Sequence, residues 1–322
     1  MRELTITKND ADQRLDRFLQ KAVPLLPGSL AQKYIRQKRI KRNGKRTEQN
    51  CRLIEGDILQ FYISDEFFET SQASPASLPG PRPNLHICHE DDHILIAEKP
   101  PGLLSHSGNT QGEPTLIDQI KSYLYHTGQW NPETEQSFTP ALCNRLDRNT
   151  GGLILAAKTA PSLKILNEKI RTHEIDKYYL LAVHGRPDPP AGRIEGHISK
   201  DARQNKVTVS AIESDHTKSA VTVYKTLETR DNLSLVECRL ETGRTHQIRA
   251  QMAFLGCPLL GDPKYGCPDQ NKSYAEPHQA LWAHRIRFSF SSDAGVLNYL
   301  NHQEFTSSNI PFLSKYFLSQ ID

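Results

Sequence analysis

The stretch NRLDRNTGGLILAAKT, from Asn144 to Thr159, places a single aspartate, Asp147, between two arginines. Taken alone, an Arg-Leu-Asp-Arg tetrapeptide is typical of a surface cluster of ion pairs, which contribute little to stability. The alternative is that Asp147 is the reactive group of an active site. The sequence around this stretch has to decide between the two interpretations.

Segments on both sides of this stretch are rich in β-branched, aromatic and alternating apolar residues, which is typical of strands. They are HILIAEK, KYYLLAVHG, AVTVYKTLE, LSLVECRL and LWAHRIRFSF. Helical spacing is clear in PSLKILNEKIR, which Pro161 opens, and in THQIRAQMAFLG, with Thr245 as the N-cap and Gly256 as the stop. The pattern predicts a large, mainly antiparallel α+β domain rather than a regular βαβ repeat.

The basic charge is concentrated at the N-terminus. The whole chain has a net charge of +3, whereas residues 1–63 contain 14 Lys and Arg against 7 Asp and Glu. Eight of these basic residues lie in KYIRQKRIKRNGKR, Lys33 to Arg46, which contains no acid. A solvated basic face is one explanation, and an appended module that binds a polyanion is the other.

Local patterns divide the chain into three parts. Apolar residues at helical spacing predict two short helices near residues 15–23 and 30–35, the second capped by Ser29, and Asn43-Gly44 predicts a hairpin turn. Residues 64–84 are rich in Ser, Pro and acidic residues and predict a linker. The predicted parts are a small N-terminal α/β domain at 1–63, a linker at 64–84 and the large domain at 85–322.

Several classes of protein and site are not supported by the sequence. No apolar run approaches the roughly 18 residues that cross a bilayer, and no secretory signal opens the chain, so we expect a cytoplasmic protein without a membrane partner. The six cysteines form no C-x-x-C pair and are interpreted as free thiols. We also expect no metal and no cofactor, since P-loop, G-x-G-x-x-G and metal-ligand patterns are missing from the sequence. A monomer is the expected oligomeric state.

The N-terminal part resembles the small RNA-binding module named after small-subunit ribosomal protein S-four. The resemblance runs from about Arg14 to Ile63 and rests on RLDRFL, a second helix, RIKRNGK and EGDILQFYI in that order. It implies that basic side chains of this part contact RNA. The candidates are Arg14, Arg17, Lys33, Arg36, Lys38, Arg39 and Arg42.

Four segments of the larger part resemble, in order, the RluA-type family of RNA pseudouridine synthases. They are EDDHILIAEKPPGLLSHSG (Glu90 to Gly108), NRLDRNTGGLILAAKT, KYYLLAVHG (Lys177 to Gly185) and TGRTHQIRAQMAFLGCPLLGDPKYG (Thr242 to Gly266). The resemblance implies a mainly antiparallel or mixed α+β catalytic domain that isomerises uridine in RNA to pseudouridine. This reaction neither gains nor loses an atom, so it requires no redox cofactor and no energy source.

The resemblance also implies roles for individual residues. Asp147 becomes the nucleophile, whose covalent intermediate divides a hard step into easier ones. Tyr179 lies against the target base, and its hydroxyl helps to remove the proton from carbon five. Arg249, with Arg244 as the second choice, is the cation that keeps the nucleophile ionised. The substrate-binding candidates are Arg145, Ile248 and Arg244, and the target base must be flipped out of any duplex.

Large-subunit ribosomal RNA is the expected substrate, because family members with an S-four-type module usually modify it. Transfer RNA is an alternative substrate, and a non-catalytic RNA-binding ribosome-assembly factor is an alternative function. A glycosidic-bond hydrolase would need a second carboxylate across the bond from Asp147, and the sequence offers no convincing one.

The chain departs from the commonest family form at Asn144, where His is usual, at Gly151, where Ser is usual, and in the HSG of residues 106–108.

Overall fold

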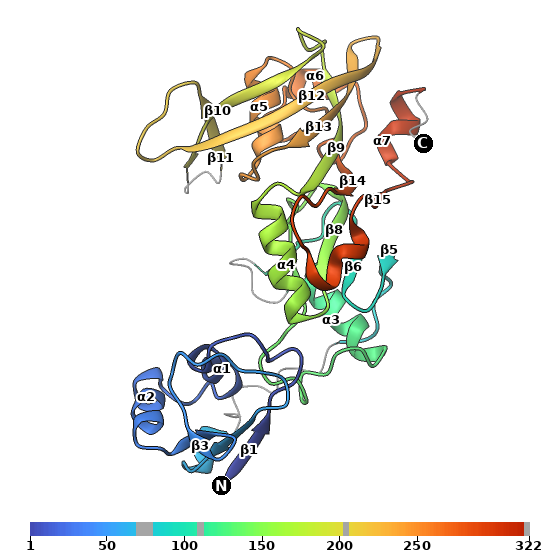
Figure 1. Cartoon of the computed structure of the whole chain (residues 1–322). Coiled ribbons are helices and arrows are strands. Elements are labelled where there is room, and N and C mark those ends of the chain that lie inside the picture. Colours follow the sequence, from blue (N-terminus) through green and yellow to red (C-terminus); the bar gives the residue numbers. More distant parts are fainter. Residues whose placement is uncertain (69–79, 108–112, 202–205, 319–322) are drawn as a thin grey trace. The chain divides into compact units, whose positions relative to one another are not determined.

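The computed structural model describes residues 1–68, 80–107, 113–201 and 206–318. Its contacts divide the chain into two compact units (Figure 1). The first unit contains residues 1–84, 117–141 and 157–164, and the second contains residues 85–116, 142–156 and 165–322.

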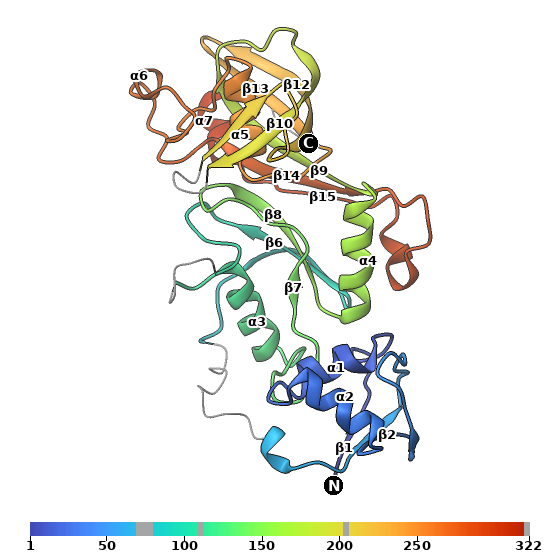
Figure 2. The same cartoon turned by 90° about the vertical axis from the view of Figure 1, so that its left-hand side faces the viewer.

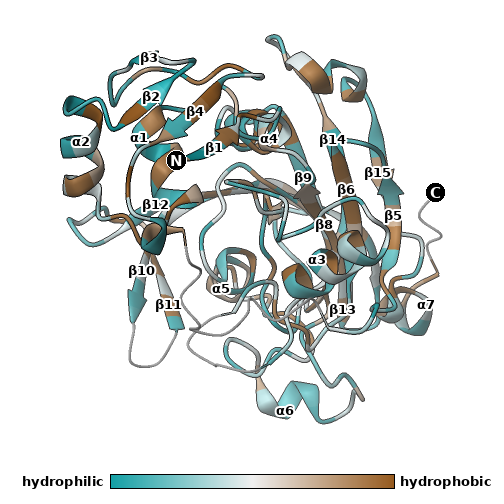
Figure 3. Cartoon of the chain, turned by 90° about the horizontal axis from the view of Figure 1, so that it is seen from below, coloured by the Kyte–Doolittle hydropathy of each residue, from teal (hydrophilic) through white to brown (hydrophobic). Residues whose placement is uncertain are grey.

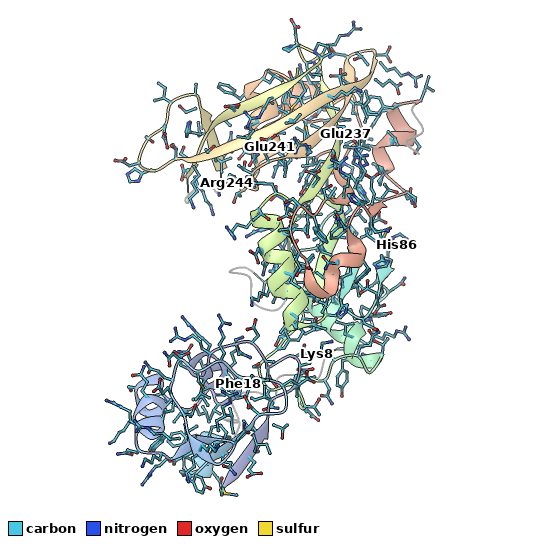
Figure 4. The ribbon with its side chains drawn as sticks, viewed as in Figure 1. Lys8, Phe18, His86, Glu237, Glu241 and Arg244 are labelled. Atoms are coloured by element: carbon cyan, nitrogen blue, oxygen red, sulfur yellow. The ribbon has the colours of Figure 1, made fainter. Side chains whose placement is uncertain are left out.

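The first unit is built on a four-stranded antiparallel sheet of order β1-β4-β2-β3, with two helices from the same part of the chain. These elements are β1 (Arg2–Thr5), α1 (Leu15–Ala22), α2 (Gly28–Arg36), β2 (Ile40–Arg42), β3 (Lys45–Arg46) and β4 (Ile58–Phe61). Phe18, labelled in Figure 4, is fully buried with Ile40 and Phe61 in the core that joins helices to sheet. The two predicted helices are confirmed.

The turn at Asn43-Gly44 is also confirmed, because both residues have positive φ, 51° and 73°, between β2 and β3. The predicted cap at Ser29 is wrong. The helix α2 begins at Gly28, with Pro27 in the N-cap position and no side chain that caps it. The proline ring fixes φ of Pro27, which is −58°, just before the first helical residue.

The beginning of the predicted linker is folded. Residues Asp65–Phe67 form a short 3₁₀ helix, η1, and the ring of Phe68 lies 5.2 Å from that of Phe61 in the first core. Residues 69–79 lie outside the described residues. The extent of the linker and the three-part division of the chain therefore stay predictions.

The second unit contains most of an 11-stranded sheet, with the order β11-β10-β12-β13-β9-β14-β8-β6-β5, while β15 pairs with β14 and β7 with β8. These strands are β5 (His86–Glu90), β6 (Ile94–Lys99), β7 (Ala141–Leu142), β8 (Gly151–Ala157), β9 (Ile175–His184), β10 (Ala191–Asp201), β11 (Lys206–Ser210), β12 (Lys218–Arg230), β13 (Leu233–Leu240), β14 (Leu281–Phe288) and β15 (Glu304–Thr306). The strand β14 runs parallel to β8 and antiparallel to β9. A mainly antiparallel α+β fold is therefore confirmed.

The remaining helices are α3 (Leu116–His126), α4 (Ala160–Arg171), α5 (Gln247–Phe254), α6 (Pro268–Asn271), α7 (Pro311–Tyr316) and the 3₁₀ helix η2 (Gly295–Leu300). The predicted helices at α4 and α5 are confirmed, and α3 was not predicted. Thr245 is wrong as a cap, because His246 occupies the N-cap position of α5 in the left-handed conformation. No helix in the described ranges is long and apolar enough to span a membrane.

Apolar strands form the centre of the large sheet. Every residue of β8 is buried, and much of the neighbouring β6 has the colour of hydrophobic residues in Figure 3. Near one end of the sheet, α5 packs against β10 and β12, as Figure 2 shows. Ala250 of α5 contributes to a small core there with Ile198, Val207 and Ala220. This packing fixes the helix that carries Ile248 and Arg249.

Candidate active site

The loop that carries Asp147 joins β7 to β8 and is held on both sides of the aspartate. Before it, the side-chain oxygen of Asn144 accepts a hydrogen bond from the backbone N–H of Leu155 at 2.8 Å. The buried Ser105 hydroxyl accepts from the N–H of Leu146 at 3.1 Å and donates to its carbonyl at 2.9 Å. Asn144, which replaces the usual histidine, therefore still anchors the loop.

After Asp147, a buried lysine fixes the chain. The ammonium group of Lys99 donates to the carbonyl oxygens of Arg148, Leu103 and Pro100 at 2.8, 2.8 and 2.9 Å. Burial lowers the pKa of Lys99 to about 7, and the negative charge of Asp147 opposes that shift. This lysine has no exposed surface, so it is a structural clamp rather than a group that meets RNA.

The carboxylate of Asp147 is paired with Arg249. Nη1 of Arg249 donates to Oδ2 of Asp147 at 3.1 Å. The same guanidinium makes two further bonds to Asp262, from Nε at 2.7 Å and from Nη2 at 2.9 Å. Arg249, and not Arg244, is therefore the counter-ion, and Asp262 fixes the plane of its guanidinium group.

Burial and charge act in opposite directions on this pair. Burial alone would raise the pKa of Asp262, but hydrogen bonds from Arg249 and from the backbone N–H groups of Lys264 and Tyr265 hold it below its usual value. Burial would likewise lower the pKa of Arg249, but Asp262 and Asp147 raise it. Arg249 is thus a fixed cation between two carboxylates.

Asp147 faces a cavity of about 380 Å³, which is large enough for a small planar ring. The six predicted catalytic and substrate-binding residues all line this cavity: Asp147, Tyr179, Arg249, Arg145, Ile248 and Arg244. Ile248 is buried, whereas Arg145 and Arg244 are exposed. Arg244, labelled in Figure 4 just beyond the end of β13, also donates from Nε to the carbonyl of Ser219 at 3.0 Å.

Tyr179 forms part of the cavity wall from the middle of β9. Its ring is buried, and within the described part of the chain its hydroxyl has no hydrogen-bond partner. Burial, and then the negative charge of Asp147, raise the pKa of Tyr179. The hydroxyl therefore stays protonated and is available to a ligand as a phenol.

Comparison with known proteins agrees with this geometry. The family model for RNA pseudouridylate synthase matches residues 93–254, which include Asp147, Tyr179 and Arg249. A ribosomal large subunit pseudouridine synthase C from Rickettsia prowazekii is 34% identical over 262 residues, which cover 79% of this chain and 82% of that protein. The chain belongs to the RNA pseudouridylate synthase family.

Two further relatives extend the comparison. A ribosomal large subunit pseudouridine synthase D from Zymomonas mobilis is 33% identical over 227 residues, covering 66% of this chain and 69% of that protein. The solved structure of human RNA Pseudouridylate Synthase Domain Containing 4 shares the fold, with a TM-score of 0.54 and 23% identity over 70% of this chain and 89% of that one. As a member of this RluA-type family, the chain is an isomerase that converts uridine in RNA to pseudouridine.

Two side chains around Asp147 have no role predicted from the sequence. Asp262 belongs to the quoted GDPKYG segment but received no role, because nothing in the sequence shows that it meets Arg249. His246 belongs to the quoted THQIR segment and likewise has no predicted role, and its Nε2 lies 3.7 Å from Oδ2 of Asp147.

The departure from the family pattern at Gly151 has a local cause. Gly151 lies directly opposite Trp282 in the parallel pairing of β8 with β14. A Cβ atom at position 151 would overlap the Trp282 ring. The usual serine is therefore excluded by the size of the residue on the neighbouring strand.

Replacing Gly151 by serine should lower the free energy of unfolding by about 1–3 kcal/mol, because the core is overpacked there. Urea denaturation measures this, with Gly80→Ser as the control, since a Cβ at Gly80 meets no atom within 4 Å. Combining Gly151→Ser with Trp282→Leu should cost less than the sum of the two single changes. Strict additivity would show that the overlap with Trp282 is not the cause.

Six of the seven predicted RNA contacts in the first unit are exposed: Arg14, Arg17, Lys33, Arg36, Lys38 and Arg39. Arg42 is less accessible, since its Nε forms an ion pair with the buried Asp57 at 2.7 Å. Arg39 lies over the ring of Tyr34, 5.6 Å from its centroid. The charge of Arg42 therefore serves the fold of this unit, while the other six side chains face solvent.

Proposed function

We propose that this chain isomerises uridine in large-subunit ribosomal RNA, with Asp147 as its nucleophile. The observation that carries the site assignment is the Asp147–Arg249 pair beside a cavity that Tyr179 also lines. The substrate assignment is supported by relatives named as ribosomal large subunit synthases. We further propose that the chain acts as a monomer in the cytoplasm.

In the proposed reaction, a carboxylate oxygen of Asp147 adds to the ribose or to the uracil ring. The bond between the ribose and uracil nitrogen one breaks, and the base turns inside the cavity. A bond then forms between the ribose and carbon five, the carboxylate leaves, carbon five loses its proton and nitrogen one gains one. Arg249 holds one oxygen of Asp147 throughout, so the attacking group need not be ordered again at each step.

Tyr179 would form the aromatic wall against which the flipped base packs. Its raised pKa limits its part in removing the proton from carbon five. A phenol can accept that proton only if its own proton passes to another group at the same time. We therefore assign Tyr179 first to stacking and to donating a hydrogen bond, with proton transfer as a coupled event.

The proposal is tested by tritium release from ribosomal RNA labelled at carbon five of uracil. Release by the native protein, followed by mapping of pseudouridine in the product, is the expected result. Release from transfer RNA alone would replace the substrate assignment. No release from either RNA, combined with intact RNA binding, would favour the non-catalytic assembly factor.

We also propose that residues 1–63 bind RNA through their exposed basic side chains. The logarithm of RNA affinity should fall with the logarithm of salt concentration, by about 0.7–0.9 for each phosphate neutralised. The double variant Arg36→Ala/Arg39→Ala should reduce this slope by roughly 1.5. Lys272→Ala is the matched control, because Lys272 is exposed directly after α6 and paired with Asp269.

Fluorescence anisotropy with a ribosomal RNA fragment gives both slopes. An affinity that does not change with salt would contradict binding by charge. Equal slopes in the double variant and in the native protein would show that the end of α2 does not contact phosphates.

A further inference from the structure

His246 lies next to the nucleophile in an unusual backbone conformation. It begins α5 at φ 52° and ψ 20°, and its side chain is 8% exposed. Nε2 lies 3.7 Å from Oδ2 of Asp147, an electrostatic contact longer than a hydrogen bond, and this oxygen already accepts a bond from Arg249. Among the residues that the structure describes, none donates a hydrogen bond to the other oxygen, Oδ1.

The second nitrogen of His246 is bound to Tyr265. Nδ1 lies 3.0 Å from the Tyr265 hydroxyl, which lies 2.8 Å from the backbone nitrogen of Val207. A backbone N–H can only donate, so the tyrosine oxygen accepts there, and its own hydroxyl proton is available for donation to Nδ1 of His246. Nδ1 is then an acceptor, and a neutral imidazole must carry its proton on Nε2.

We propose that Tyr265 locks His246 in the Nε2–H tautomer, so that Arg249 and His246 together hold Oδ2 of Asp147 and leave Oδ1 as the attacking atom. His246 and Tyr265 are positioning residues in this proposal, which rests on the proposed role of Asp147. The other tautomer would turn a nitrogen lone pair toward the carboxylate and repel it.

The surroundings favour a neutral imidazole. Burial lowers the pKa of His246, the negative charge of Asp147 opposes this, and the charge of Arg249 adds to the lowering. The charged or titratable groups that face His246 are Asp147, Arg249, Lys264, Asp262 and Tyr265. An imidazolium would need a proton on Nδ1, where the Tyr265 hydroxyl already points its own.

The ring of Tyr265 is held independently of its hydroxyl. The guanidinium carbon of Arg249 lies 5.2 Å from the ring centroid, and the ammonium of Lys206 lies 5.3 Å from it. Tyr265→Phe keeps these cation–π contacts and removes the hydroxyl, and with it both the proton donor to His246 and the acceptor for the N–H of Val207. This variant therefore separates the tautomer lock from the packing of the ring.

The tautomer can be measured without any activity. In protein labelled with ¹⁵N-histidine, long-range proton–nitrogen correlation distinguishes Nε2–H from Nδ1–H, and His246→Gln assigns the signals among the 13 histidines. We expect pure Nε2–H in the native protein and a mixture in Tyr265→Phe. A native protein with the proton on Nδ1, or the same tautomer in Tyr265→Phe as in the native protein, would overturn the proposal. This outcome does not depend on whether Asp147 proves to be the nucleophile.

Single-turnover kinetics on ribosomal RNA test the effect on the reaction. Tyr265→Phe should lower the rate constant by about 10- to 100-fold, because the carboxylate loses its fixed orientation, with little change in RNA affinity. The acid limb of its pH profile should move to higher pH, since a bond that favours the neutral imidazole is lost. A purely structural role would leave that limb in place, and this result would overturn the proposal. In His246→Gln the part of the limb that comes from His246 should vanish, and only the part that comes from protonation of Asp147 should remain.

Discussion

Asp147→Asn should abolish tritium release from uridine-labelled RNA, with a loss of at least about 10⁴-fold in the single-turnover rate constant. An amide has nearly the same shape as a carboxylate but is not a nucleophile at neutral pH. The site itself should survive the change, because Arg249 keeps its two hydrogen bonds to Asp262. The variant should therefore bind RNA and unfold at the same urea concentration as the native protein.

The matched control is Asp231→Asn. Asp231 is an exposed turn residue with φ 53°, a conformation that asparagine adopts as readily as aspartate. The activity of the Asp231→Asn variant should equal that of the native protein. A rate for Asp147→Asn within tenfold of native would remove Asp147 as the nucleophile, and loss of RNA binding would mean that the comparison has measured binding instead of chemistry.

Arg249→Met should damage both stability and catalysis. The side chain of Asp262 has no exposed surface, so the variant leaves a buried carboxylate without its cation, at a cost of about 3–5 kcal/mol in the free energy of unfolding. The rate constant should fall by about 10²–10³-fold, because Asp147 loses its charged hydrogen-bond donor. Urea denaturation and tritium release measure the two effects separately.

A second substitution distinguishes the effect of Arg249 on stability from its effect on catalysis. Asp262→Asn in the Arg249→Met background removes the unpaired charge, while its amide oxygen can still accept from the N–H groups of Lys264 and Tyr265. We expect stability to recover and activity to remain lost. Recovery of activity in the double variant would show that Arg249 acts on the fold alone and not on Asp147.

Much of the architecture could be predicted from local sequence. The alternating apolar strands, the Asn43-Gly44 turn and the helices at α4 and α5 depend on neighbouring residues, and the structure contains all of them. Helix starts were less predictable. The caps assigned to Ser29 and Thr245 were wrong, because Pro27 and a left-handed His246 begin those helices instead.

The features of the site that could not be predicted from the sequence depend on contacts between segments that lie far apart in the chain. The pairing of Arg249 with Asp147 was predicted through the family resemblance, and the structure places the two groups in contact. The bond from Arg249 to Asp262 and the overlap that excludes serine at Gly151 each depend on a fold that brings separate strands and loops together. A single sequence contains no signal for either contact.

The position of β14 determines when the site can be completed during synthesis. This strand lies between β9 and β8, although it follows both in the chain, so it joins two parts of the sheet that are made earlier. Asp147 lies just before β8, on one side of β14 in the sheet. Arg249 lies 102 residues later in the chain and belongs to the part on the other side, which contains β9. A nascent chain therefore cannot close the sheet until β14, which ends at Phe288, has left the ribosome.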